Sequence, residues 1–197
     1  YGNIFRVSDC PGSAVSNRTG TTDLRLLSGS TAVHSDMLMW HPDEKPEDAG
    51  LQLLSCLFAT VQISVCLDQI TDDMKRMLLF WLGFMDEKRE ILLHSQIQPE
   101  EPENLYPEVC AECGNEKILV HYSKGRLADL RDINKKIYYI HAVKEEEVCF
   151  RCNSSDTLKY EVRDCYGNLM ESNEVSANQF VIISVPTSGM VEFTRKL

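Results

Sequence analysis

The spacing of apolar residues changes after Tyr106, and this change constrains the possible folds more than any other feature of the sequence. Before it, short apolar runs alternate with stretches in which apolar residues recur every three or four positions, as in strands that alternate with helices. After it, apolar residues recur at every second position, in short segments separated by Gly, Asn, Asp and Pro. The sequence therefore predicts an α/β region followed by an all-β region.

The first region, residues 1–96, is predicted to contain three βα units and hence a parallel sheet. One helix begins near Pro46, and another begins after Thr71, whose side chain is suited to cap it. The second helix carries an apolar stripe and should end near residue 93; the stripe consists of Met74, Met77, Leu78, Trp81, Leu82 and Met85. The expected strands cover residues 3–7, 31–37 and 62–67.

Residues 97–104 are acidic and contain two prolines, a composition typical of a linker between domains. Beyond them, residues 105–197 are predicted to form a small antiparallel β-sandwich. Its clearest strands lie near residues 118–122, 136–140, 158–162, 180–185 and 190–193. The predicted architecture is thus a partial (β/α)8 barrel, with three of the eight βα units, followed by the sandwich.

Polar side chains occur where the first two strands end. Asp9 directly follows the first strand and precedes Pro11, which opens a loop. His34 and Asp36 lie two positions apart on the second strand, so a regular strand places them on one face. Because the active sites of (β/α)8 barrels gather at the carboxyl ends of the strands, these three residues are candidate site residues.

Segments of both regions resemble family 36 glycoside hydrolases, and they occur in the same order. The matching segments are Phe-Arg-Val-Ser-Asp-Cys-Pro at 5–11, Asp-Leu-Arg-Leu-Leu-Ser-Gly at 23–29, Val-His-Ser-Asp-Met-Leu-Met-Trp-His at 33–41, Gln-Ile-Ser-Val-Cys-Leu-Asp at 62–68, Asp-Cys-Tyr-Gly at 164–167 and Val-Pro-Thr-Ser-Gly-Met at 185–190. The resemblance implies that the chain is the C-terminal portion of a retaining α-galactosidase, containing its last three βα units and its terminal β-sandwich.

In that family, the aspartate that follows the sixth barrel strand is the acid/base residue, and the resemblance places it at Asp9. The nucleophilic aspartate belongs to the fourth strand, which this sequence does not contain. A retaining mechanism needs both carboxyl groups, about 5 to 5.5 Å apart. The resemblance therefore implies terminal α-galactosides of small oligosaccharides as substrates, no cofactor, and no activity of this chain alone.

Three parallel strands leave unpaired edges and an apolar face, which favours association. We expect the chain to self-associate or to associate with the upstream barrel portion that carries the nucleophile. The rival hypothesis is a non-catalytic fragment or interaction module that packs against a partner chain.

Each candidate residue also has a structural interpretation. Asp9 can serve in a turn or as a helix cap, and His34 with Asp36 can form a structural hydrogen-bonded pair instead of contacting sugar hydroxyls. Trp40 can stack on a sugar ring or pack against neighbouring methionines. Cys10 can line the pocket or fill a small apolar space.

Two CxxC pairs raise the question of a zinc site: Cys110 with Cys113, and Cys149 with Cys152. The spacer of 35 residues between the pairs is longer than in the usual zinc ribbon, and both pairs fall at strand-like positions. We therefore expect free thiols and no tightly bound zinc.

The net charge limits the classes of binding partner, and the cysteine content indicates the cellular compartment. The 30 acidic and 20 basic residues give a formal net charge of -10, which disfavours binding to nucleic acid or to an anionic membrane. No apolar run reaches the roughly 18 to 20 residues that span a bilayer. Eight cysteines in a chain of this size are more typical of a reducing compartment than of a disulfide framework, so a cytoplasmic location is expected.

Overall fold

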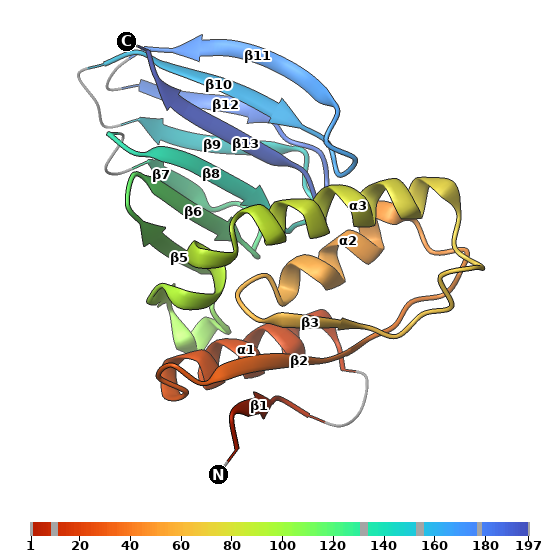
Figure 1. Cartoon of the computed structure of the whole chain (residues 1–197). Helices are drawn as coiled ribbons and strands as arrows, with labels where there is room; N and C mark the ends of the chain where they lie inside the picture. The colour runs from red at the N-terminus through yellow and green to blue at the C-terminus, as the bar shows by residue number, and fades with distance from the viewer. Residues whose placement is uncertain (1, 9–11, 131–133, 153–155, 177–178, 197) are drawn as a thin grey trace.

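The computed structural model describes residues 2–8, 12–130, 134–152, 156–176 and 179–196. Within these ranges the chain forms a parallel three-stranded sheet, a layer of helices, and a sandwich of a seven-stranded and a three-stranded sheet. In Figure 1 the parallel sheet lies at the bottom, α2 (Pro46–Ser55) and α3 (Asp72–Glu87) lie above it, and the sandwich lies at the top. The predicted order of an α/β region and a sheet-rich region is confirmed. No helix in the described ranges is long and apolar enough to cross a bilayer.

The first layer is a parallel sheet, as the sequence predicts. β1 (Ile4–Arg6), β2 (Ala32–Leu38) and β3 (Thr60–Ile63) pair in this order, and each strand runs parallel to the next. β3 is shorter than expected. The chain leaves the sheet after Ser64, whose amide still donates to the Leu38 carbonyl, and Leu67 is exposed to solvent.

Three α-helices follow the strands: α1 (Ala14–Leu27), α2 (Pro46–Ser55) and α3 (Asp72–Glu87). Pro46 occupies the first turn of α2, where its missing N–H costs no hydrogen bond. Thr71 caps α3 by accepting a hydrogen bond from the Met74 amide over 3.1 Å. After α3, a π-helical turn, η1 (Glu90–His94), leads to the sandwich.

The remaining strands form a β-sandwich. The larger sheet has the spatial order β11-β10-β13-β8-β6-β5-β4, and the smaller sheet has the order β12-β9-β7. The facing sides of the two sheets enclose an apolar core that includes Tyr139, Phe150 and Phe193. The strand bounds are β4 (Ile97–Glu100), β5 (Glu108–Cys113), β6 (Glu116–His121), β7 (Leu127–Leu130), β8 (Lys136–His141), β9 (Glu147–Cys152), β10 (Leu158–Arg163), β11 (Leu169–Val175), β12 (Gln179–Ser184) and β13 (Met190–Arg195).

Two strand pairs of the sandwich are parallel, so the expectation of a purely antiparallel sandwich is wrong in part. β6 pairs parallel with β8, and β7 pairs parallel with β9. The cause is the chain path, which crosses from β6 to β7 in the smaller sheet, returns to β8 and crosses again to β9. Each sheet receives alternate strands of this run, and alternate strands point the same way.

The segment expected to be a linker belongs largely to the sandwich. Of residues 97–104, the first four form β4, which pairs antiparallel with β5 at the edge of the larger sheet. Ile97 is buried there and anchors the segment. Pro99 is compatible with this strand because an edge strand needs partners on one side only. A 3-10 helix, η2 (Pro102–Asn104), completes the segment.

Helices α2 and α3 fill the space between the parallel sheet and the larger sandwich sheet with one continuous core, here named the shared core. It combines helix side chains, such as Leu54 and Trp81, with side chains of the larger sheet, such as Val120 and Tyr138. The central strands β5, β6 and β8 are buried on both faces, because their other sides face the smaller sheet. The α/β region and the sandwich therefore pack as one body instead of meeting only at a linker.

Close polar contacts fix the helices against the sandwich. A Cβ atom on Gly50 of α2 would lie 2.9 Å from the Ser188 side chain, so glycine permits this approach. The Ser188 hydroxyl donates to the Glu47 carbonyl oxygen over 2.7 Å. At the C-terminal end of α3, Nζ of the buried Lys88 lies 2.7 Å from the Glu116 carboxylate of β6. These polar contacts fix where the helices lie against the larger sheet.

The shared core predicts how strongly α3 stabilises the chain. Trp81→Ala should lower the free energy of unfolding by about 3 to 5 kcal/mol, because Trp81 is fully buried and its removal leaves a cavity. Leu79→Ala is the matched control on the same helix. Its side chain is 73% exposed, so the change should stay within about 0.5 kcal/mol. Urea unfolding followed by circular dichroism measures both, and equal losses would contradict the shared core.

Candidate functional site

Asp9 and Cys10, the residues expected to supply the acid/base group and to line the pocket, lie outside the described residues. The structure describes this segment as far as Ser8, shortly after β1 ends at Arg6. β1 is an outer strand of the parallel sheet and pairs with β2, so the described segment ends just past the carboxyl edge of this sheet. This is the edge at which the sequence predicts a site.

An ion pair between Arg6 and Asp36 lies at this edge. Arg6 Nη2 donates to Asp36 Oδ1 over 3.0 Å, and the Met37 amide donates to the same oxygen over 2.8 Å. The Asp36 side chain is fully buried, whereas 37% of the Arg6 side chain is exposed. The pair ties β1 to β2 at the carboxyl edge of the parallel sheet.

Asp36 is held in its ionised form. Burial raises the pKa of its carboxyl group, but hydrogen bonds from the Met37 amide, Arg6 and Ser8 together outweigh burial and leave the pKa below its ordinary value. Asp36 is therefore a carboxylate at neutral pH and is unsuited to donate a proton.

A β-bulge brings Asp36 into this position. His34 pairs with Thr60 and Met37 pairs with Gln62, so three steps along β2 correspond to two steps along β3. At the bulge, the Ser35 hydroxyl accepts a hydrogen bond from the Gln62 backbone amide over 3.0 Å. The bulge changes the side-chain alternation, and both Ser35 and Asp36 are buried.

The bulge also separates the two residues that were expected to share a face. Regular alternation predicts that His34 and Asp36 point the same way, and this expectation is wrong because the extra residue intervenes. His34 Nδ1 lies 2.7 Å from the Ser35 carbonyl oxygen, whereas Asp36 pairs with Arg6. Arg6 is not among the residues predicted from the sequence; the signal available for it was the need of a buried aspartate for a cation.

Trp40 follows β2 at the same edge. Its partly buried ring packs against the shared core, an arrangement that favours the packing interpretation over stacking on a sugar. Its indole Nε1 is buried and has no hydrogen-bond partner among the described residues.

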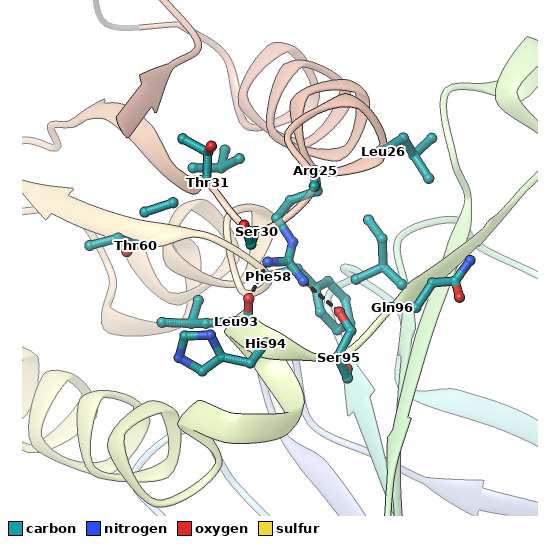
Figure 2. Close-up of a pocket in the computed structure, with 14 residues that line it drawn as sticks. Arg25, Leu26, Ser30, Thr31, Phe58, Thr60, Leu93, His94, Ser95 and Gln96 are labelled. Atoms are coloured by element: carbon teal, nitrogen blue, oxygen red, sulfur yellow. Dashed lines mark hydrogen bonds between the residues drawn. The ribbon is translucent and has the colours of Figure 1, made fainter. Parts of the chain in front are cut away.

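The opposite edge of the parallel sheet holds a cavity of about 410 Å³, at the amino ends of β2 and β3 (Figure 2). None of the residues proposed from sequence lines it. Arg25 lies at its centre, and its guanidinium group donates to the carbonyl oxygens of Leu93 and Ser95. The cavity is therefore separate from the candidate site at the carboxyl edge.

Strand geometry separates the members of each CxxC pair. Residues three positions apart on a strand point to opposite faces. Accordingly, Cys110 is buried in the sandwich core while Cys113 is exposed, and Cys152 is buried while Cys149 is half-buried. The first pair belongs to the larger sheet and the second to the smaller sheet. Within the described ranges, no three His, Cys, Asp or Glu side chains are grouped so that they could hold a metal ion.

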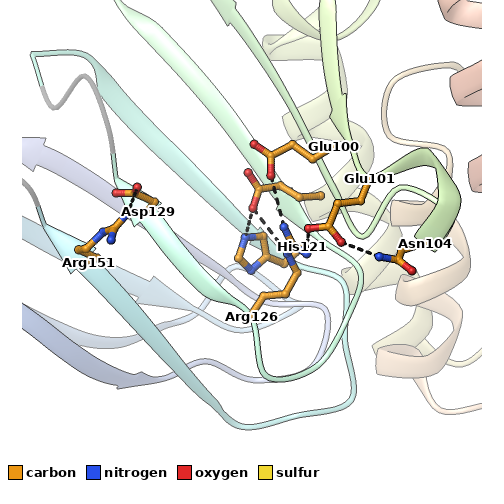
Figure 3. Close-up of polar contacts among 8 residues, drawn as sticks. Glu100, Glu101, Asn104, His121, Arg126, Asp129 and Arg151 are labelled. Atoms are coloured by element: carbon orange, nitrogen blue, oxygen red, sulfur yellow. Dashed lines mark hydrogen bonds and ion pairs between the residues drawn. The ribbon is translucent and has the colours of Figure 1, made fainter.

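A second polar cluster, which the sequence analysis missed, lies in the sandwich near β4, β5 and β6 (Figure 3). Arg126 binds Glu101 over 2.8 Å and Glu100 over 3.3 Å. The buried His121 ring lies with Nε2 2.7 Å from the Glu108 carboxylate. Because each of these charged groups has a partner within the cluster, we interpret it as a structural network that fastens the end of β4.

The chain matches no protein-family model, and no curated protein matches it. The resemblance to family 36 glycoside hydrolases thus rests on the sequence segments alone, and the function that follows from it is a proposal.

The Arg6–Asp36 pair predicts a specific pH dependence of stability. Asp36→Asn should lower the free energy of unfolding at pH 7 by roughly 1 to 3 kcal/mol, because the charge-assisted hydrogen bond between Arg6 and the buried Asp36 is lost. The pKa of Asp36 is lower in the folded state than in the unfolded state, so its contribution is full above about pH 4 and is lost as the pH falls further. The difference in unfolding free energy between wild type and Asp36→Asn should therefore become smaller below about pH 4.

Urea unfolding at pH 7, 5 and 3 tests this dependence. Asp43→Asn is the matched control, since 91% of the Asp43 side chain is exposed and its removal should change little at any pH. If the difference in unfolding free energy between wild type and Asp36→Asn is constant from pH 7 to pH 3, the ion pair does not contribute to stability.

The strand positions of the CxxC pairs predict well under one zinc per chain in purified protein. Elemental analysis of wild type, Cys110→Ser and Cys149→Ser measures this, and the three zinc contents should agree. One zinc per chain that disappears in either variant would show that the thiols converge in solution.

Proposed function

We propose that this chain supplies the last three βα units and the terminal β-sandwich of a retaining, α-galactosidase-like glycoside hydrolase, with Asp9 as the acid/base residue. The observation that supports this proposal most is the Arg6–Asp36 pair at the carboxyl edge of a parallel sheet, where Ser8, the residue before Asp9 in the sequence, also bonds the buried Asp36 carboxylate. Enzymes of the (β/α)8 class bind substrates at this edge. The substrates would be terminal α-galactosides of small oligosaccharides, and the reaction needs no cofactor.

The proposed mechanism gives Asp9 and Asp36 different roles. A retaining glycosidase needs one carboxyl group that is protonated before the first step, and a second one that attacks the anomeric carbon. Asp36 is unsuited to be the acid because its pKa is held below the ordinary value. Asp9 takes that role, and its pKa would be raised by the negative charge of a nearby nucleophile. Arg6 and Asp36 would then act as a positioning pair that holds the end of β1 against β2.

The nucleophile would come from a further βα unit, and the sheet has room for such units on both sides. β1 and β3 are the outer strands of the described sheet. Phe5 of β1 is 46% exposed, and a groove of about 260 Å³ runs beside β3, with Val61, Leu82 and Met85 in its walls. An added βα unit would pair with the open strand and cover these apolar side chains. The chain would thus be active only together with such units.

The same surfaces support a second candidate, a non-catalytic module that packs against a partner chain. Leu79 on α3 is largely exposed, as is Ile4 on β1, and such side chains favour association whether or not catalysis follows. The two candidates differ in one respect: only the first requires Asp9 for activity.

The compartment remains part of the proposal. The seven described cysteines are free thiols, which supports a cytoplasmic enzyme.

Asp9→Asn tests the catalytic proposal. In the assembly of this chain with the units that complete the barrel, the variant should hydrolyse natural α-galactosides about 10²- to 10⁴-fold more slowly, because it has no proton to donate. Aryl α-galactosides with good leaving groups should be affected less at the first step. Steady-state kinetics on both substrates measures the difference.

Asp72→Asn, which changes a 96% exposed aspartate at the start of α3, is the control and should retain full activity. Small and equal losses on both substrates for Asp9→Asn would exclude Asp9 from the mechanism. Turnover by this chain alone, as a monomer, would show that the nucleophile lies within these residues.

A further inference from the structure

The cavity at the amino ends of β2 and β3 has the size of a small-molecule site. Its volume of about 410 Å³ lies within the range of roughly 300 to 1,000 Å³ that is typical of ligand pockets. Its walls come from the end of α1, the loop at residues 29–31, the first residues of β2 and β3, and residues 93–97, which run from the end of η1 to the start of β4. The site is therefore built from several separate elements of the fold (Figure 2).

Arg25 gives this cavity an uncompensated positive charge. Its guanidinium group has five N–H donors, of which two are used by the Leu93 and Ser95 carbonyl oxygens. These carbonyl groups hold the guanidinium in place but carry no net charge. Arg25 forms no ion pair with a carboxylate of the described residues, and burial lowers its pKa. Its Nε atom is buried without a partner in the described part of the chain.

The lining of the cavity contrasts with the composition of the chain. The sequence contains 30 acidic residues, yet no Asp or Glu lines the cavity. An unpaired cation in a partly desolvated site is costly unless a counter-charge is present. Because the walls supply no counter-charge, a bound anion is the group that would provide it.

Polar side chains line the cavity that holds Arg25. Ser30, Thr31, Thr60, His94 and Gln96 line the cavity, and within the described ranges none of these five side chains makes a hydrogen bond. Hydroxyl, amide and imidazole groups can all donate to an oxyanion. Phe58 and Val33 supply apolar surface beside them, which suits the uncharged part of a ligand.

We propose that this cavity binds the phosphate group of a small, sugar-sized molecule. The two Nη N–H groups of Arg25 that the carbonyl bonds leave free bind two phosphate oxygens, as the planar guanidinium group is suited to do, and hydroxyl groups of the loop at 29–31 bind a third. The remaining volume holds the carbon skeleton of the ligand. The site faces away from the carboxyl edge and is independent of the proposed glycosidase function.

Isothermal titration calorimetry of the chain with glucose 6-phosphate, inorganic phosphate and glucose tests the proposal. Glucose 6-phosphate should bind, inorganic phosphate should bind more weakly, and glucose should not bind. Equal affinities for inorganic phosphate and glucose 6-phosphate would show that the sugar part does not contribute to binding, and would contradict the proposal of a sugar-sized ligand.

Two variants locate the site. Ser30→Asp places a carboxylate at the exposed mouth of the cavity and leaves the bonds of Arg25 intact, and it should weaken binding by at least about tenfold. Arg25→Gln should abolish binding. Because Arg25→Gln also removes two bonds to the chain, circular dichroism must show that it is folded, and Ser30→Asp carries the test if it is not.

Gln69→Glu is the control of equal charge change, at an exposed position after β3, and it should bind as wild type does. Failure of both phosphates to bind the wild-type chain would overturn the proposal. Undiminished binding to Ser30→Asp, or equal weakening by Gln69→Glu, would do the same, because the effect would then not arise in this cavity.

Discussion

The burial of α2 and α3 between two sheets is the constraint on which the rest of the structure depends. Sheets and amphipathic helices must bury their apolar faces against another layer. The larger sandwich sheet is apolar on both faces, so without the helices it would expose side chains such as Val120 and Tyr138. The helices in turn support the parallel sheet, whose carboxyl edge holds Arg6, Asp36 and the segment that leads to residue 9. The proposed site therefore depends on packing that extends into the sandwich.

Much of the fold could be predicted because its signals are local. Pro46 and Thr71 mark helix starts through their own chemistry, and the spacing of apolar residues distinguishes helices from strands. The rest depends on pairing between distant residues. β4 is a four-residue strand that contains Pro99, so its composition is that of a linker, and only Ile97 indicates burial. The parallel pairs of the sandwich follow from the crossing of the chain between sheets, which no short segment encodes.

The candidate site was predictable to a smaller extent. Placing polar residues at the carboxyl edge requires only that the strands be parallel, which the alternation of strands and helices predicts. The orientation of Asp36 depends instead on a bulge, and the bulge depends on the register between β2 and β3. Arg25 was not recognised because its carbonyl partners lie 68 and 70 residues further along the chain. Spacing within the sequence contains no signal for such contacts.

The shared core is tested most directly by hydrogen exchange of backbone amides in increasing urea, read by mass spectrometry on peptides from β2 and from β8. If the helices join both sheets into one cooperative unit, the two sets of amides should lose protection at the same urea concentration, with the same dependence on urea. If β2 loses protection at a concentration at which β8 remains protected, the α/β region and the sandwich unfold separately, and the account of a single shared core is contradicted.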